Sequence, residues 1–187
     1  HLHGGNSNGF HKQLWQGQSE EGQDYNSVHL KYLSPDRQAG YPGNLQLTVS
    51  YTLKDDNSLT IDYYAVPDQD TPVSLTHHSY FNLKGAGEDT VDDHKLQIFS
   101  DKIIENKAEF LATGNIIPAK DTPMDFSELK AIGRDIEKKH QQMNLQEGYA
   151  FYYIYEDGKS KDRRSAKVVE PVSGRCMELE TDAPGLF

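Results

Sequence analysis

The residues that most constrain the fold lie between positions 45 and 53 and read LQLTVSYTL. Apolar or aromatic side chains at 45, 47, 49, 51 and 53 alternate there with polar ones. A period of two is typical of a strand that buries one face. The turn formers KDDNS follow, and the alternation resumes in LTIDYYA at 59–65. The sequence therefore predicts a β-hairpin.

Short segments of strand character recur along the rest of the chain, separated by Gly, Pro, Asp and Asn clusters. They lie at 72–81, 94–99, 148–155, 166–170 and 175–181. Only 125–142 has helix-like spacing, and Gly133 weakens it, so we expect one short helical turn or two there. Many short strands with little helix favour an antiparallel β-sandwich or barrel. Because no repeat or linker-like tract divides the chain, we expect one domain over residues 1–187.

The charge of the chain restricts its partners. The 187 residues carry 29 acidic and 19 basic side chains, a formal net charge of -10. We therefore expect neither nucleic acid nor an anionic membrane as a partner, and no apolar run approaches the roughly 20 residues of a membrane-spanning helix. Cys176 is the single cysteine and there is no Asn-x-Ser/Thr sequon. These features favour a soluble protein of the reducing cytoplasm.

Four of the eight histidines form two groups, His1 with His3 and His77 with His78. From the residues alone, these rings could pack in half-buried positions, hold a metal or transfer protons near neutral pH. Adjacent strand residues face opposite sides, which leaves one ring of the second pair for any one site and disfavours a metal. The stretch HSYFN from His78 suits a sugar, whose hydroxyls need hydrogen bonds and whose C–H face packs on aromatic rings.

The sequence lacks the motifs of several other chemistries. There is no Gly-x-Gly-x-x-Gly before a helix, no Walker loop, no Gly-x-Ser-x-Gly and no His-Glu-x-x-His. Ser79 beside His78 does not make a hydrolase, since a nucleophilic serine needs a base positioned across space. The acidic stretch GEDTVDDH at 87–94 lacks the spacing of a calcium loop, and we expect it to be a solvated loop.

Several longer stretches, taken together, resemble the aldose 1-epimerases, or galactose mutarotases. They are LHGG with GFHKQLW, SPDRQAGYPGNL, VSYTL, TPVSLTHHSYFNL, ATGNIIP, TPMDF and TDAPG. Their order and approximate spacing are those of the family over essentially the whole chain. The resemblance implies an antiparallel β-sandwich of the galactose-mutarotase type, incomplete at both ends. It also implies interconversion of the α and β anomers of hexoses such as galactose and glucose.

The resemblance further implies the site residues. His78 corresponds to the general acid that protonates the ring oxygen, and His3 to the second active-site histidine. Ser79 and Tyr80 match positions that line the sugar. A general base removes the anomeric hydroxyl proton, the ring opens, the C1–C2 bond rotates and the ring closes on its other face. The partner is an aldose, and no metal, nucleotide or other cofactor is implied.

The chain also departs from the family. Members begin well before LHGG, with an Asn-Arg pair that binds sugar, and continue past TDAPG to the glutamate base. The 187 residues contain neither segment, so we expect a central fragment that is impaired on its own. Where the family reads GYDHAF, this chain reads GYAF at 148–151 and lacks the sugar-gripping Asp. Glu147, just before it, is a weak substitute.

These departures keep alternatives open. The first is a noncatalytic sugar-binding protein on the same fold. The second is a phosphosugar epimerase, which is disfavoured because no basic cluster stands near His3 or His78 to hold a phosphate. The sequence predicts neither the preferred aldose nor the oligomeric state.

Overall fold

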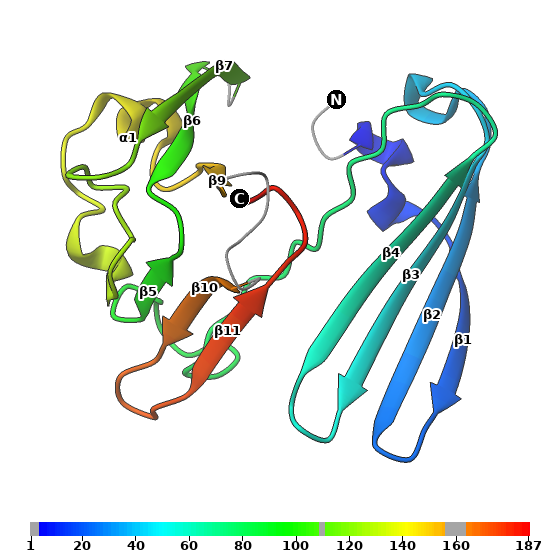
Figure 1. Ribbon diagram of the computed structural model, residues 1–187, viewed down its shortest axis with the longest axis horizontal. Helices are drawn as coiled ribbons and strands as arrows, with labels where there is room; N and C mark the ends of the chain where they lie inside the picture. The colour runs from blue at the N-terminus through cyan, green and yellow to red at the C-terminus, as the bar shows by residue number, and fades with distance from the viewer. Residues whose placement is uncertain (1–3, 109–110, 156–163) are drawn as a thin grey trace. The chain divides into compact units, whose positions relative to one another are not determined.

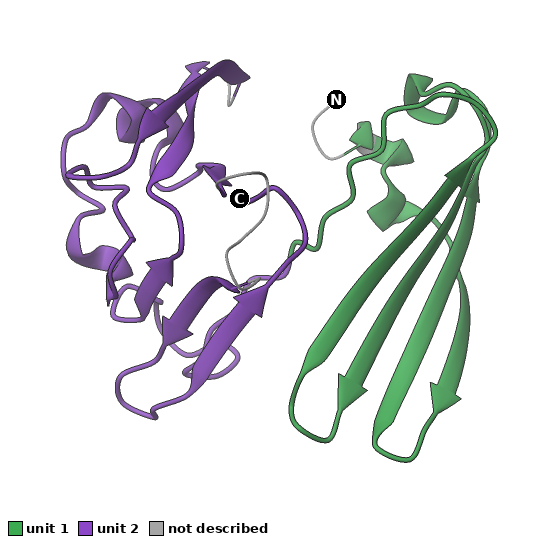
Figure 2. Cartoon of the chain, viewed as in Figure 1, with its two compact units in different colours: residues 1–78 green, residues 79–187 purple. Residues whose placement is uncertain are grey.

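The computed structural model describes residues 4–108, 111–155 and 164–187 (Figure 1). This described part consists mainly of antiparallel strands, with one short α-helix, α1 (Gln141–Gln146). It contains no helix long and apolar enough to cross a membrane. The chain divides into two compact units, residues 1–78 and 79–187 (Figure 2). The expectation of one domain over residues 1–187 stays a prediction.

Unit 1 contains a sheet of four consecutive antiparallel strands in the order β1-β2-β3-β4 (Figure 1). Their bounds are β1 Gln16–Glu21, β2 Tyr25–Ser34, β3 Leu45–Lys54 and β4 Leu59–Pro67. The predicted hairpin is confirmed as β3 and β4. Its turn places Asn57 at a positive φ of 64°, and the Asp56 carboxylate accepts a hydrogen bond from the Ser58 amide. Strands β1 and β2 were not predicted from the sequence.

The register of this sheet explains the alternation. Leu47 lies between Tyr32 of β2 and Ala65 of β4. Val49 lies between Leu30 of β2 and Tyr63 of β4. These central β3 side chains are buried, as is Leu45. One face of the sheet is therefore apolar in its middle, as a period-two strand predicts.

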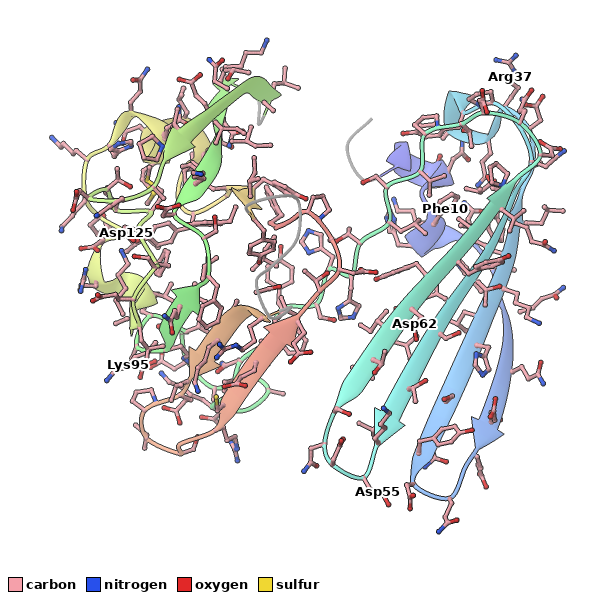
Figure 3. The ribbon with its side chains drawn as sticks, viewed as in Figure 1. Phe10, Arg37, Asp55, Asp62, Lys95 and Asp125 are labelled. Carbon is pink, nitrogen blue, oxygen red and sulfur yellow. The ribbon has the colours of Figure 1, made fainter. Side chains whose placement is uncertain are left out.

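An aromatic cluster lies where the N-terminal segment meets the sheet. The Phe10 ring packs edge-on against Trp15 and Tyr32, with centroids 6.4 and 6.0 Å away (Figure 3). The indole N–H of Trp15 donates to the Phe10 carbonyl at 2.9 Å. The segment around these residues forms two short 3₁₀ turns, η2 (Asn6–Asn8) and η3 (Phe10–Lys12). Edge-to-face packing and a satisfied indole fix this segment to β2.

The loop between β2 and β3 also holds the N-terminal segment. It contains the 3₁₀ turn η4 (Gln38–Gly40). The Gln38 side-chain oxygen accepts from the hydroxyls of Tyr32 and Ser34 at 2.8 and 2.9 Å. Its amide nitrogen donates to the Asn8 carbonyl at 3.1 Å. One side chain thus joins β2 to the glycine-rich segment.

Unit 2 contains two further four-stranded antiparallel sheets, in the orders β11-β10-β5-β8 and β12-β9-β6-β7. Their bounds are β5 Lys95–Ile98, β6 Lys102–Lys107, β7 Leu111–Pro118, β8 Lys130–Ala131, β9 Tyr153–Ile154, β10 Arg164–Val169, β11 Cys176–Glu180 and β12 Gly185–Leu186. The strands expected at 94–99, 166–170 and 175–181 are confirmed as β5, β10 and β11. Of the segment 148–155, only β9 is a strand.

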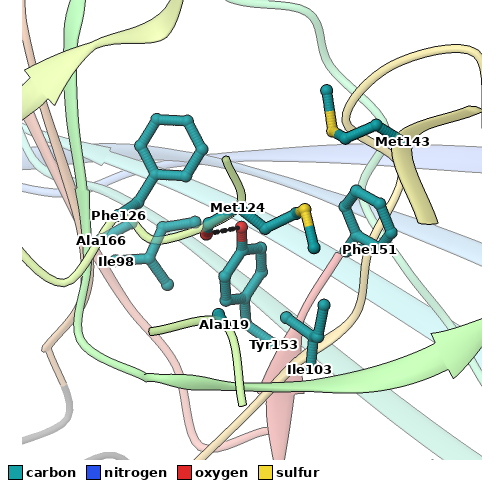
Figure 4. Packing of buried hydrophobic residues seen from close by; sticks show 9 residues of the cluster. All are labelled: Ile98, Ile103, Ala119, Met124, Phe126, Met143, Phe151, Tyr153 and Ala166. Atoms are coloured by element: carbon teal, nitrogen blue, oxygen red, sulfur yellow. Dashed lines mark hydrogen bonds between the residues drawn. The ribbon is translucent and has the colours of Figure 1, made fainter. Parts of the chain in front are cut away.

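The core of unit 2 joins both sheets and α1. Its buried members are Ile98, Ile103, Ala119, Met124, Phe126, Met143, Phe151, Tyr153 and Ala166 (Figure 4). The Tyr153 hydroxyl donates to the Met124 carbonyl at 2.7 Å, so its polar end is satisfied inside the core. Burial raises the pKa of this phenol.

One secondary-structure prediction is wrong. A strand was expected at 72–81, but residues 71–82 have no regular secondary structure. Aromatic and β-branched composition suggested that strand, yet Tyr80 of this segment is 91% exposed rather than packed on a sheet. The strand was predicted from composition, and composition does not show whether a segment pairs with another strand.

One short helical turn or two were expected at 125–142, and this prediction is confirmed. The segment contains the 3₁₀ turn η6 (Ile132–Arg134) and the start of α1 at Gln141, with strand β8 before η6. The Gly133 amide donates to the Asp92 carbonyl at 2.7 Å. A Cβ at Gly133 would lie 2.8 Å from the Asp92 Cβ. This close approach of a distant loop overrides the helical spacing of the segment.

Candidate active site

The segment that carries His78 connects the two units of the chain. His78 is the last residue of unit 1, and Ser79 is the first of unit 2. The side chains of His77, His78, Ser79 and Tyr80 are all exposed. Because the segment is not a strand, strand alternation does not separate the two histidines, and that step of the sequence argument is wrong.

The two histidines nevertheless differ in their surroundings. The His77 ring packs against the Tyr51 ring of β3, with centroids 6.0 Å apart and planes at 62°. This is an edge-on aromatic contact, and it assigns His77 a packing role within unit 1. The role of His78 stays a prediction. Its chain neighbours Ser79 and Tyr80 carry a hydroxyl and a phenol.

His3 lies outside the described residues, as does His1. The structure does describe the segment that follows His3. Gly4 and Gly5 adopt positive φ values of 72° and 99°. A Cβ at Gly5 would lie 2.7 Å from the Ala39 Cβ, so only glycine fits at this approach of the two segments. Residues 4–9 are thus held against the β2–β3 loop, directly after the predicted active-site histidine.

Two exposed aromatic rings follow His78. The side chains of Tyr80 and Phe81 are 91% and 52% exposed. Aromatic faces that reach solvent beside hydroxyl and imidazole groups suit a ligand with both apolar and hydrogen-bonding sides. A pyranose has both, because its C–H groups and hydroxyls lie on different faces of the ring.

The loop that follows, residues 82–94, is internally ordered. The Asn82 amide nitrogen donates to the Glu88 carbonyl at 2.6 Å. The Lys84 ammonium lies 2.9 Å from the Asp93 carboxylate and donates to the Thr90 carbonyl. The hydrogen bond from Lys84 lowers the pKa of Asp93. The same bond raises the pKa of Lys84.

The prediction of a solvated loop at 87–94 holds for most of these residues but is wrong for His94. Glu88, Asp89 and Asp92 are exposed, whereas His94 is only 1% exposed. Sequence reasoning did not single out this histidine. Its position at the start of the predicted strand 94–99, where a polar loop ends, is the signal that could have drawn attention to it.

The GYAF segment continues from α1 into the core. Glu147 ends α1 with a positive φ of 53° and is exposed. The Tyr149 ring packs edge-on against Phe126 at 5.1 Å, and Phe151 is buried. Burial raises the pKa of Tyr149 to about 12. The aromatic side chains of this segment are used for packing, and Glu147 stands at a solvent-exposed helix end.

Neither of two surface hollows in the described part of the chain is lined by residues of the His78 segment. One, of about 460 Å³, lies beside α1 and is lined by Lys139, His140, Gln141, Asn144 and Leu145. The other, of about 310 Å³, lies on the sheet of unit 1 and is lined mainly by residues of β1, β2 and β3. Neither combines the imidazole and aromatic groups that the proposed sugar chemistry needs.

Comparisons with known proteins match the whole chain. Galactose mutarotase from Rattus norvegicus is 36% identical over 185 residues, which cover 99% of this chain and 51% of the relative. Aldose 1-epimerase from Escherichia coli is 32% identical, with 99% and 52% covered. The chain therefore spans about half the length of these curated relatives.

Solved structures give the same result for the fold. A galactose 1-epimerase from Lactobacillus acidophilus superposes with a TM-score of 0.81 at 27% identity, covering 91% of this chain and 48% of that protein. An aldose epimerase homologue from C. elegans gives 0.83 at 28% identity, covering 99% and 53%. The predicted antiparallel β fold of the galactose-mutarotase type is confirmed. The sequence model of the aldose 1-epimerase family matches residues 1–187, and the chain belongs to this family.

Proposed function

We propose that the protein containing this chain is an aldose 1-epimerase, which interconverts the α and β anomers of a hexose such as galactose or glucose. The observation that carries the proposal is the family match over all 187 residues. A galactose mutarotase at 36% identity and an aldose 1-epimerase at 32% identity over the chain support it. The exposed imidazole, phenol and aromatic groups at 78–81 supply suitable chemistry for a sugar.

In this proposal His78 is the general acid. It donates a proton to the ring oxygen as the bond between that oxygen and C1 breaks. A base takes the proton of the C1 hydroxyl, and the electron pair of that O–H bond forms the C=O double bond of the aldehyde. Rotation about C1–C2 and the reverse proton transfers close the ring as the other anomer. His3 is the second active-site histidine, and Ser79 and Tyr80 contact the sugar. The reaction breaks and re-forms one C–O bond and transfers protons without any net oxidation or reduction, so the proposal includes no cofactor.

We propose a glutamate as the general base, in a segment of the whole protein after TDAPG. The family resemblance implies such a residue, and the chain spans about half the length of its curated relatives. A missing general acid or base typically costs on the order of 10²–10⁴-fold in rate. The proposed activity therefore belongs to the whole protein.

A second candidate is a noncatalytic sugar-binding protein. The observation that favours it is the GYAF segment, whose Tyr149 and Phe151 pack inside unit 2 and whose neighbour Glu147 ends α1. No Asp follows Gly148 to hold the sugar hydroxyls. Sugar binding measured by calorimetry, without any acceleration of mutarotation, would favour this candidate.

Polarimetry on freshly dissolved α-galactose tests the main proposal. The intact protein should speed mutarotation, and His78→Ala should lower kcat on the order of 10²–10⁴-fold because it removes the proton donor. His77→Ala is the matched control, since this ring packs on Tyr51. It should leave kcat near the wild-type value. Retained activity in His78→Ala, or equal losses in both variants, would exclude His78 as the acid.

A further inference from the structure

Leu83 is held on both sides of its main chain by side chains that are distant in sequence. Its amide donates to Nε2 of His94 at 3.1 Å. Its carbonyl accepts from Nη1 of Arg175 at 2.9 Å, and the same nitrogen donates to the Lys84 carbonyl at 3.0 Å. We call His94 and Arg175 the Leu83 clamp. It holds the chain three residues after Tyr80 and five after His78.

The His94 side of the clamp is rigid. Its ring is 1% exposed. Since Nε2 accepts the Leu83 amide, the proton of the neutral ring is on Nδ1, which faces the Asp93 carboxylate at 3.3 Å. The His94 carbonyl accepts from the Ile132 amide at 2.9 Å. Strand β5 begins at the next residue, so the backbone of His94 is fixed to a sheet.

Asp93 links this ring to the loop that it holds. Its carboxylate contacts both Nδ1 of His94 and the ammonium of Lys84, the latter at 2.9 Å. The Lys84 carbonyl is in turn an acceptor of Arg175. These contacts form one connected network around the peptide units of Leu83 and Lys84.

On the other side of the clamp, a hydrogen-bonded turn fixes the main chain at Arg175. Arg175 precedes β11 at the end of the tight connection from β10, and its carbonyl accepts from the Glu170 amide at 2.9 Å. Glu170 is 1% exposed and accepts from the amides of Val172 and Ser173, which fixes the turn. Both halves of the clamp thus come from the sheet β11-β10-β5-β8.

We propose that His94 and Arg175 are positioning residues, which hold the main chain at Leu83 so that the segment His78–Tyr80 keeps the geometry needed for sugar binding and proton transfer. The proposal rests on the proposed function. The segment itself has no strand or helix to fix it, because residues 71–82 are irregular. The side chains of His94 and Arg175, which directly precede strands β5 and β11, hold the main chain that follows it. A displacement near 1 Å at a reacting group can cost on the order of 10²-fold in rate.

Substitutions in the intact protein test the clamp. Arg175→Ala removes two hydrogen bonds from an exposed side chain, so the protein should still fold. His94→Phe removes the acceptor and keeps a ring, whereas His94→Gln keeps an acceptor oxygen. We expect kcat to fall roughly 10- to 100-fold in the first two variants and to recover in the third. Because His78 acts in the transition state, kcat should change more than KM.

Hydrogen exchange at the Leu83 amide gives a readout independent of activity. It should accelerate in His94→Phe and approach the wild-type rate in His94→Gln. Lys167→Ala is the matched control, because it removes an ion pair with Glu178 on the same hairpin without touching the loop. Both the exchange rate and kcat should stay near wild type in this control.

The outcomes separate the two proposals. If His78→Ala abolishes mutarotation while Arg175→Ala and His94→Phe keep wild-type kcat, the positioning role is overturned and the proposed function stands. Unchanged Leu83 exchange in His94→Phe would overturn the clamp itself. If the wild-type protein has no mutarotase activity, the proposed function fails and the catalytic positioning role fails with it, even where exchange shows that the clamp exists.

Discussion

At the scale of single residues, the burial of an ion pair determines its contribution to the free energy of unfolding more than the distance between its charged atoms does. Lys130 and Asp135 lie 2.8 Å apart with side chains about 4% exposed. Lys167 and Glu178 also lie 2.8 Å apart, but on the surface. Exposed pairs typically contribute 0–1 kcal/mol, whereas breaking a buried pair leaves one charge without compensation. The two pairs should therefore respond very differently to loss of the acid.

Asp135→Asn should destabilise the protein by about 3 kcal/mol or more, as measured by urea unfolding. The Lys130 ammonium would stay beside the Phe126 ring, 4.3 Å from its centroid, without its carboxylate. Glu178→Gln is the matched control and should change the free energy of unfolding by less than about 1 kcal/mol. Equal effects would show that burial does not separate the two pairs.

The effect of Asp135→Asn should also depend on pH. Hydrogen bonds from Lys130 and Lys138 lower the pKa of Asp135 in the folded chain. A carboxylate whose pKa is lower in the folded than in the unfolded chain stabilises the protein at pH values above the unfolded pKa, about 3.9. This stabilisation is lost as the pH falls from there toward the folded pKa. The difference in unfolding free energy between wild type and Asp135→Asn should therefore shrink below about pH 4. A constant difference from pH 6 to pH 3 would contradict this account.

At the scale of elements, local pattern predicted the hairpin β3–β4 and the strands β5, β10 and β11, but not β1 and β2. The hairpin β3–β4 follows from period-two alternation and a turn sequence. The strand predicted at 72–81 was wrong, because residues 71–82 have no regular secondary structure. The close approach of Gly133 to Asp92 is a long-range contact of the kind that sequence pattern does not show. Family resemblance located His78. It did not reveal the Leu83 clamp, because Arg175 lies 92 residues from Leu83.

Gly185 illustrates such a long-range constraint within β12. It pairs with Ile154 of β9, and a Cβ there would lie 2.3 Å from the Tyr153 carbonyl oxygen. That contact is with backbone, so it cannot be relieved by a rotamer change. Gly185→Ala should therefore separate β12 from β9 and cost roughly 1–3 kcal/mol in unfolding free energy. Exchange of the Tyr155 amide, which donates to the Pro184 carbonyl, should also accelerate.

Gly17→Ala is the control for that substitution. Gly17 lies on strand β1, and a Cβ there would meet only the Leu30 side chain at 3.6 Å, an ordinary contact. Alanine should be tolerated there, because it also restricts the unfolded chain more than glycine does. If Gly185→Ala were as stable as Gly17→Ala, close packing of β12 on β9 would be excluded.

At the scale of the whole molecule, the predicted acid occupies the connection between the two compact units. Unit 1 ends at His78 and unit 2 begins at Ser79. Sequence reasoning could assign the family over the full chain but not this boundary, since no linker-like composition marks it. The boundary follows from the tertiary contacts. The strands β1–β4 of unit 1 pair with one another, and the members of the buried core all belong to unit 2.

Limited proteolysis should reveal this connection. Chymotrypsin should cut first after Tyr80 or Phe81, because both are exposed aromatic residues and residues 71–82 have no regular structure. Tyr64 is also 68% exposed, but it pairs with Thr48 in the β3–β4 ladder, which keeps its backbone from the protease. Mass spectrometry of early digests identifies the cleaved bond. First cleavage within the sheet of unit 1 would contradict the prediction.

The same digest measures whether the connection binds sugar. If Tyr80 contacts the aldose, a saturating concentration of galactose should slow cleavage there in proportion to the fraction of protein bound. Leu14, 96% exposed and outside the regular elements of unit 1, provides a reference cleavage site in the same tube. Its cleavage rate should not change. If galactose slowed both sites equally, it would be acting on the protease or on global stability. If it slowed neither, Tyr80 would not be a sugar contact, and the proposed site would have to lie elsewhere.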